Sequence, residues 1–244
     1  MNAYYTAALI PIIAALCACQ KAPEIIDEAQ AKAPVSSASV NNPVIVELYQ
    51  SQGCSSCPPA NAAVNAVADQ PGVIALSFAV TYWDRLGWKD VFGDKAYTQR
   101  QYDYAHALGN PNVYTPQIVI NGKTAITGIK SGELAQNIAS AKGLSGGPSI
   151  DVNGDKVMIG RGTGAANIWI VRYDPRIQNV AIRSGENTGR TLPHKNIVRS
   201  LTKLGEWNGA AQGYTLSSAA DKGLKTAILV QRQGAGPIIA AKVI

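Results

Sequence analysis

The amino-acid sequence predicts an α/β domain over residues 43–146, followed by a mostly β, sandwich-like domain over residues 147–244. In the first region, apolar runs of strand length alternate with segments whose apolar residues recur at helical spacing. In the second region, short strand-like runs are separated by turn residues, which is typical of a sandwich or barrel. The two patterns meet at Gly146-Gly147-Pro148, where we place the domain boundary.

The first region is expected to run in the order strand, helix, strand, helix, hairpin, helix. Its strands are β-branched and apolar, its first helix stops at Pro71-Gly72, and Asn121-Gly122 makes the hairpin turn. The expected elements are strands at 43–50 and 73–80, helices at 61–72, 94–109 and 131–143, and hairpin strands at 116–121 and 123–128.

The second region is expected to contain strands only. Turn residues divide it at short and fairly even intervals, and no internal repeat is evident. The strand-like runs lie at 149–162, 167–174, 179–185, 196–205, 213–217, 225–233 and 237–244.

Residues 1–19 are predicted to be a secretion signal, because their apolar run is uncharged but too short for a comfortable membrane span. The run ends in Leu16-Cys17-Ala18-Cys19, which resembles a bacterial lipobox in which Cys19 receives the lipid. Two features depart from that pattern: no basic residue precedes the apolar run, and Cys17 is unusual at its position. The alternative is an ordinary cleaved signal that leaves Cys19 as a stray thiol on a secreted protein.

Residues 20–42 are rich in Ala, Pro, Ser and charge, so they are predicted to be a disordered tether. The protein is therefore expected to be a lipoprotein of the bacterial cell envelope that faces the periplasm, where disulfides persist. After processing, Cys54 and Cys57 are the only thiols left in the folded part.

The formal net charge of +6 comes from Lys and Arg residues that are scattered along the chain. A diffuse excess of this kind is typical of a solvated surface, so nucleic acid is not an expected partner. The sequence has no Gly-rich phosphate loop or dinucleotide fingerprint, and no small-molecule cofactor is implied.

The stretch "SQGCSSCPPA" places Cys54 and Cys57 two residues apart, between a strand and a helix. The N-terminus of a helix favours a thiolate, which is the species that attacks disulfides. We therefore predict that Cys54 is an exposed nucleophile and Cys57 a shielded resolving thiol. The partners would be thiols or disulfides of proteins or small molecules, and the direction of exchange is not readable. As a staple, the pair would constrain the unfolded chain little.

Several long motifs occur in order along the chain. They are "VELYQSQGCSSCPPANA", "YWDRLGWKD", "TQRQYDYAHALG", "VYTPQIVING" and "GENTGRTLPHKNIVRSL". Together they resemble an envelope-protein family known as domain of unknown function 1223, and the region from 43 to 146 looks like a thioredoxin fold. This resemblance implies a cis proline at Pro116 that faces the cysteine turn, with the backbone of Thr115 pairing with substrate. Members of the family commonly have His and Asp where this chain has Ala79 and Thr81.

Glu47 lies on the strand that enters the cysteine turn, and a buried carboxylate there would accept the proton of the resolving thiol. Its offset from Cys54 leaves open a core Glu paired with a basic residue instead. Asp84 is a similar candidate whose other task is to cap its loop. Trp83 and Trp88 either wall the site or fill the core.

Other functions remain open. Besides the cysteines, the candidate ligands after processing are His106, His194 and Met158, and neither histidine has ligand spacing to Cys54. This leaves weak copper binding by two thiolates and disfavours structural zinc or a Cys–His hydrolase. A binding or scaffold lipoprotein with a permanent disulfide is the main alternative. Its working surface would be the β-rich region, where the basic segment 185–199 is either a solvated turn or a cover that leans over the cysteines.

Overall fold

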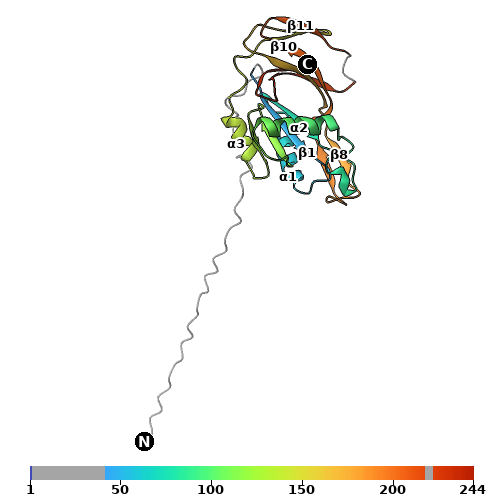
Figure 1. The fold of residues 1–244 in the computed structure, drawn as a ribbon. Helices are drawn as coiled ribbons and strands as arrows, with labels where there is room; N and C mark the ends of the chain where they lie inside the picture. Colours follow the sequence, from blue (N-terminus) through green and yellow to red (C-terminus); the bar gives the residue numbers. More distant parts are fainter. Residues whose placement is uncertain (2–41, 218–221) are drawn as a thin grey trace. The chain divides into compact units, whose positions relative to one another are not determined.

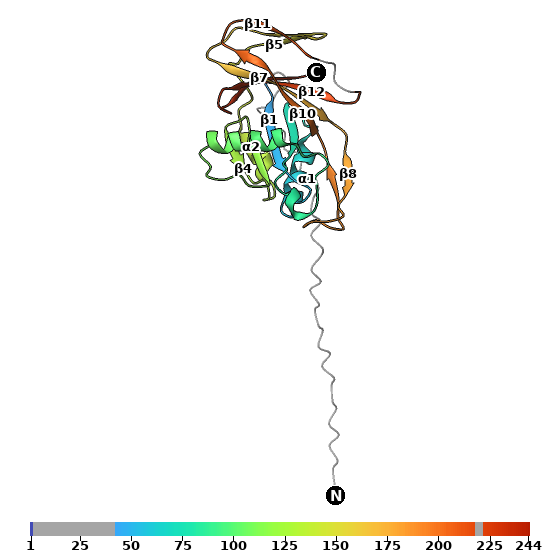
Figure 2. The same cartoon turned by 45° about the vertical axis from the view of Figure 1, so that its right-hand side comes forward.

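The computed structural model describes Met1 and residues 42–217 and 222–244 (Figures 1 and 2). Within this part the main feature is an eight-stranded mixed sheet in the order β13-β12-β7-β10-β2-β1-β3-β4. Its strands are β1 (Val44–Gln50), β2 (Val73–Ala79), β3 (Gln117–Ile120), β4 (Thr124–Ile126), β7 (Ala166–Asp174), β10 (Ile197–Trp207), β12 (Lys225–Arg232) and β13 (Ile238–Val243).

The remaining described elements are three α-helices, one 3-10 turn and two small sheets. The helices are α1 (Cys57–Val67), α2 (Lys95–Ala107) and α3 (Glu133–Ser140), with the 3-10 turn η2 at Asp84–Leu86. One small sheet joins β5 (Ile150–Asn153), β6 (Lys156–Ile159) and β11 (Gln212–Thr215), and the other joins β8 (Gln178–Ala181) to β9 (Thr191–His194). The predicted strand–helix order of the first region is confirmed at this level, including the hairpin of β3 and β4.

The prediction of a thioredoxin-like α/β domain followed by a sandwich-like β domain is wrong. Strands from both predicted regions belong to one sheet, because β10 joins β2 in parallel at Ile197 and Ser77. The neighbouring Asn196 strengthens this junction: its carbonyl accepts the Ser77 N–H (2.9 Å), and its side-chain amide donates to Ala75 O (2.9 Å). The described part is mostly β. Its single large sheet depends on pairing between strands that are far apart in the sequence, which local sequence patterns do not reveal.

Strands β1 and β2 are mostly apolar and are buried on both faces, because both faces are covered. Even-numbered residues of β1, such as Val46, pack in a cluster with apolar residues of α1 and α3. Odd-numbered residues, such as Ile45 and Tyr49, pack in a second cluster with Tyr97 and Tyr104 of α2. The helices α1 and α2 therefore lie on opposite faces of β1, which determines where each side chain of this strand can act.

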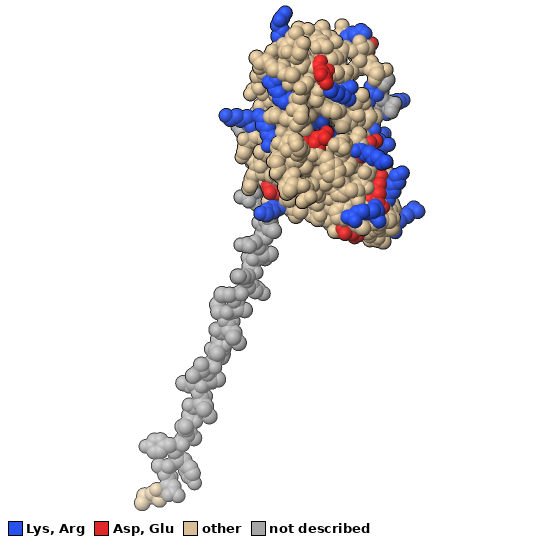
Figure 3. Space-filling model, in the orientation of Figure 1, with Lys and Arg blue, Asp and Glu red and all other residues tan. Residues whose placement is uncertain are grey.

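A third apolar cluster joins β5 and β6 to the strands β7 and β12, around the buried Trp207. In Figure 2, β5 and β11 lie at one end of the described body, and β8 lies beside α1 at the other. No described helix has the length and apolarity needed to cross a membrane. On the face drawn in Figure 3, Lys and Arg side chains occur from one end of the described body to the other, with acidic side chains among them.

Candidate functional site

The cysteine turn links the end of β1 to the start of α1. Cys54 and Cys57 form a disulfide, and Cys57 is the first residue of the helix, followed by two prolines that need no intrahelical N–H partner there. The relative exposure of Cys54 is 0% and that of Cys57 is 1%. The expectation of an exposed Cys54 is therefore wrong, because neighbouring segments cover the oxidised pair.

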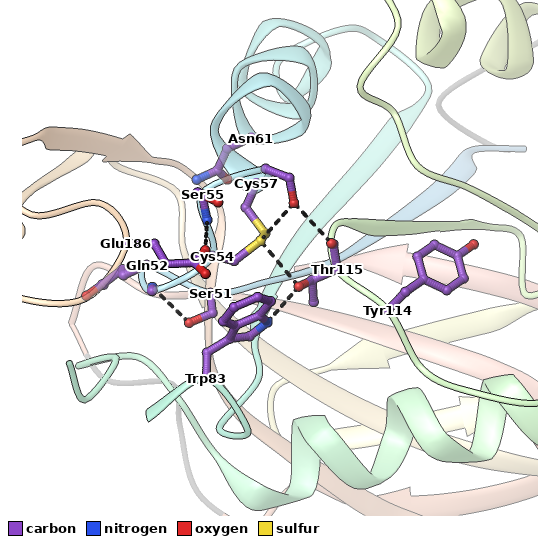
Figure 4. The surroundings of a disulfide bond; sticks show 12 residues. Ser51, Gln52, Cys54, Ser55, Cys57, Asn61, Trp83, Tyr114, Thr115 and Glu186 are labelled. Atoms are coloured by element: carbon purple, nitrogen blue, oxygen red, sulfur yellow. Dashed lines mark hydrogen bonds between the residues drawn. A yellow bond between two sulfur atoms is a disulfide. The ribbon is translucent and has the colours of Figure 1, made fainter. Parts of the chain in front are cut away.

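Thr115 provides one part of this cover. Its hydroxyl donates to Cys54 Sγ (3.3 Å) and accepts the indole N–H of Trp83 (2.7 Å), as Figure 4 shows. Its carbonyl accepts the hydroxyl of Ser56 (3.3 Å), whose Oγ lies 3.4 Å from Cys54 Sγ. The Thr115–Pro116 peptide bond is cis. The sulfur thus has a hydrogen-bond donor that a tryptophan holds in place, and a donor of this kind stabilises a thiolate.

Gln52 fixes the other side of the turn. Its backbone N–H donates to Asp90 Oδ2 (2.7 Å), its side-chain oxygen accepts the Trp88 N–H (2.8 Å), and its carbonyl accepts the Asn187 amide (2.9 Å). Burial raises the pKa of Asp90 to about 6. Asp84 acts as a loop cap, since its carboxylate accepts the Asp90 N–H (3.1 Å).

The loop between β8 and β9, residues 182–190, lies against the same turn. Glu186 Oε2 accepts the N–H of Ser55 (3.0 Å), and Asn187 Nδ2 donates to Cys54 O (2.8 Å). Of the two alternatives left open for the segment 185–199, the cover over the cysteines is the one observed at these two residues. Ser55 itself is exposed, so the cover stops at the surface of the turn.

Glu47 lies elsewhere. It is fully buried on the odd-numbered face of β1, where Arg100 Nε donates to its Oε1 (2.8 Å) and the Tyr104 hydroxyl donates to its Oε2. Gln231 of β12 donates to the same Tyr104 hydroxyl (2.9 Å). Glu47 therefore pairs with α2, whereas Cys57 belongs to α1 on the opposite face.

A buried histidine joins the β8–β9 hairpin to the cysteine-bearing helix. His194 has a relative exposure of 0%, and its Nδ1 lies 2.8 Å from the side-chain nitrogen of Asn61, one turn beyond Cys57. Burial lowers the pKa of His194 to about 4, so the ring is neutral at pH 7 and its Nδ1 accepts the Asn61 N–H.

At the two positions where family members commonly have His and Asp, this chain has Ala79 and Thr81, and neither residue has an observed hydrogen bond to a cysteine sulfur. Ala79 is buried at the end of β2. The hydroxyl of Thr81 makes a hydrogen bond with the hydroxyl of Thr98 (3.1 Å). Cys19 lies outside the described residues. Within the described residues, no group of three or more His, Cys, Asp or Glu side chains has an arrangement that could hold a metal ion.

The chain matches a family model described as a protein of unknown function (DUF1223) over residues 45–231. This chain belongs to the DUF1223 family. The family resemblance drawn from the motifs is thereby confirmed. The motif "GENTGRTLPHKNIVRSL" of this family member contains Glu186, Asn187 and His194, all of which contact the cysteine turn or α1.

Two solved structures are similar to this DUF1223 chain. The crystal structure of protein AGR_C_4864 from Agrobacterium tumefaciens is 31% identical, with a TM-score of 0.70, and the match covers 85% of this chain and 95% of that one. HBP35 of Porphyromonas gingivalis is 15% identical with a TM-score of 0.53, over 85% of this chain and 76% of that one, a likeness of fold alone. The comparison with curated proteins found no match.

The sequence pointed to Cys54, Cys57 and Thr115, which the structure brings together, and to Pro116, which follows directly. It missed Glu186, Asn187 and Asp90 as individual contacts of the turn. The signal for the first two was the polar "GENTG" stretch between strands, although its distance of some 130 residues from the cysteines gave no partner.

Proposed function

We propose that this protein exchanges disulfides with a dithiol or disulfide partner through Cys54 and Cys57. The observation that supports this most is the hydrogen bond from the Thr115 hydroxyl to Cys54 Sγ (3.3 Å), because the sulfur that it contacts would be a thiolate in the reduced protein. The short separation of the cysteines also permits an intramolecular return attack.

The electrons and protons of the exchange balance without any reactant other than the partner. One thiolate of a dithiol partner attacks Cys54 Sγ, the Cys54–Cys57 bond breaks, and Cys57 leaves as a thiolate that takes up a proton. The second thiolate of the partner then attacks the partner sulfur of the mixed disulfide and releases Cys54. Two electrons and two protons pass to the protein, and the partner becomes a disulfide. In the reverse sequence, the reduced protein donates two electrons to a partner disulfide, which becomes a dithiol, and the Cys54–Cys57 disulfide forms again.

Because Cys54 is covered, the partner must displace part of the cover before it attacks. The exposed residues Ser55 and Ser56 and the contact of Glu186 with Ser55 form the outer part of that cover. We therefore expect reaction with small thiols to be slow. A protein partner that binds this surface would react faster.

A second candidate is a scaffold or binding protein with a permanent structural disulfide. The burial of both sulfurs favours this candidate, since a reactive cysteine is ordinarily accessible. The two candidates differ in one measurable property, which is whether the disulfide can be reduced reversibly while the protein stays folded.

The test is a redox titration of the full-length chain against glutathione buffers, followed by thiol labelling. Mass spectrometry of the tryptic peptide 33–85 reports Cys54 and Cys57 alone, because Cys17 and Cys19 fall outside it. A reversible transition, with a glutathione adduct trapped on Cys54 in Cys57→Ser, supports exchange. A pair that stays oxidised in every buffer, with no adduct in Cys57→Ser, contradicts exchange and leaves the scaffold.

The place of this chemistry is part of the same proposal. The sequence of residues 1–42 supports a lipid on Cys19 and a tether that holds the folded body at the envelope membrane, facing an oxidising compartment.

A further inference from the structure

Glu186 places a carboxylate against the backbone of the cysteine turn. Its Oε2 lies 3.0 Å from the N–H of Ser55, the peptide group that directly follows Cys54, and Figure 4 shows the carboxylate beside this turn. The hydrogen bond from Ser55 lowers the pKa of Glu186, so the carboxylate is ionised at neutral pH. A full negative charge is therefore held at the peptide group that joins Cys54 to Ser55.

The position of this carboxylate is fixed by its neighbour. Asn187 is fully buried, and its amide donates to both Gln52 O (2.9 Å) and Cys54 O (2.8 Å). Arg190 donates to the side-chain oxygen of Asn187 (2.8 Å), which orients that amide. Exposed charges usually contribute little because they are mobile. Glu186 is exposed, but the residue next to it is anchored on the same turn.

The negative charge of Glu186 is not part of an observed ion pair. Among the described residues, the salt bridges that involve Glu side chains are those of Glu47 with Arg100 and Glu206 with Lys203. At the start of α1, free N–H groups would favour a thiolate on Cys54. Here the carboxylate of Glu186 occupies the N–H of Ser55 and repels a negative sulfur.

We propose that Glu186 sets the reduction potential of the Cys54–Cys57 pair by disfavouring the Cys54 thiolate. This inference rests on the proposed exchange function. Glu186 is a tuning residue rather than a catalytic one, since its charge acts on the Cys54 sulfur from the Ser55 peptide group, where it is held, without contacting the sulfur. Its effect opposes that of Thr115, which donates to the same sulfur. Glu186 therefore favours the disulfide, whereas Thr115 favours the reduced pair.

Other titratable groups lie around the turn and are present in every variant compared. Asp90 and Asp84 face it from the loop of residues 83–92, Arg190 contacts Asn187, and His194 contacts Asn61 of α1. The variant Glu186→Gln keeps an oxygen that accepts the Ser55 N–H and removes only the charge. Glu186→Ala removes both. Glu206→Gln, on an exposed part of β10, is the charge-matched control.

The experiment measures two properties of the full-length protein, each read on the tryptic peptide 33–85. The first is the equilibrium constant for reduction by glutathione. The second is the pH dependence of Cys54 alkylation by iodoacetamide in the reduced protein. In Glu186→Gln we expect the equilibrium to shift roughly threefold to tenfold towards the dithiol, with alkylation at lower pH. A tenfold shift corresponds to about 30 mV for this two-electron couple. Glu206→Gln should match the wild type.

The outcomes separate the two hypotheses. A wild-type protein that titrates reversibly, with Glu186→Gln unchanged in both measurements, overturns the inference and leaves the exchange function intact. A shift in Glu186→Ala without one in Glu186→Gln also overturns it, because the effect would then come from the hydrogen bond and not from the charge. A wild-type pair that no buffer reduces contradicts the exchange function, and the inference fails with it.

Discussion

Asn61 and His194 join the helix that begins with Cys57 to the β8–β9 hairpin through one buried hydrogen bond of 2.8 Å. The histidine must stay neutral in this contact, because its Nδ1 accepts a hydrogen from the Asn61 amide. The cysteine-bearing helix is therefore attached to a part of the chain more than 130 residues away by a group whose pKa in the folded protein is about 4.

His194 should make the fold sensitive to acid. Its pKa is about 4 in the folded protein against 6.5 in an unfolded chain, so only the unfolded chain takes up the proton between these values. Stability from this residue is complete above pH 6.5 and is lost as the pH falls towards 4, by about 3 kcal/mol. In His194→Asn, whose oxygen replaces Nδ1, urea unfolding should show a smaller loss between pH 7 and 4. An equal loss in both proteins would contradict the assignment.

Asp90 should have the opposite pH dependence. Its pKa is about 6 in the folded protein against 3.8 when unfolded, so the folded protein holds the proton more tightly. The protonated Asp90 carboxyl contributes about 3 kcal/mol to the free energy of unfolding below pH 3.8. This contribution is lost as the pH rises to about 6. Asp90→Asn should therefore gain stability relative to the wild type as the pH rises from 4 to 7. Urea midpoints at the two pH values measure this, and a constant difference would refute it.

Thr115→Val should make the disulfide harder to reduce. The substitution keeps the shape of the side chain but removes the donor to Cys54 Sγ and the acceptor of the Trp83 N–H. A hydrogen bond to a charged group contributes about 1.5–3 kcal/mol, so we expect the glutathione equilibrium to shift roughly tenfold to a hundredfold towards the disulfide. Thr202→Val, on an exposed position of β10, is the matched control. An unchanged equilibrium in Thr115→Val would show that the contact does not affect the reduced state.

Glu47→Gln should destabilise the fold and leave the redox equilibrium unchanged. The substitution leaves the Arg100 guanidinium buried without its counter-charge, and loss of one partner of a buried pair costs about 3–5 kcal/mol. Denaturant unfolding measures the loss, and the double variant Glu47→Leu/Arg100→Met should recover much of it. A shift in the glutathione equilibrium of Glu47→Gln would instead favour a role for this carboxylate in proton transfer.

Cys19→Ser should release the protein from the membrane fraction of an expressing bacterium. The proposed lipid is attached to this sulfur, and a hydroxyl cannot replace it. Fractionation and labelling with a radioactive fatty acid measure the change, with Cys17→Ser as the control that should still be labelled. Equal membrane binding and no label in the wild type would contradict the anchor.

The sequence predicted those parts of the site that depend on neighbours along the chain. The cysteine pair between a strand and a helix, and the Thr115–Pro116 segment before a strand, carry local signals. The face on which Glu47 lies follows from strand alternation, but only once the positions of α1 and α2 are known. The pairing of β2 with β10 and the contact of Glu186 with Ser55 have no local signal, because each joins segments that are more than 100 residues apart.

The junction of β2 with β10 has a consequence for the order of events during synthesis. Until Asn196 and Ile197 have emerged, β2 is an apolar strand with an open edge that can pair with another chain. Glu186 and Asn187 emerge only a few residues before them, so the cysteines are also uncovered until this stage. A nascent chain made from its N-terminus thus has a period in which oxidants can reach both sulfurs. The arrival of residues 186–197 covers the open edge of β2 at Ser77 and shields the new disulfide at the same stage.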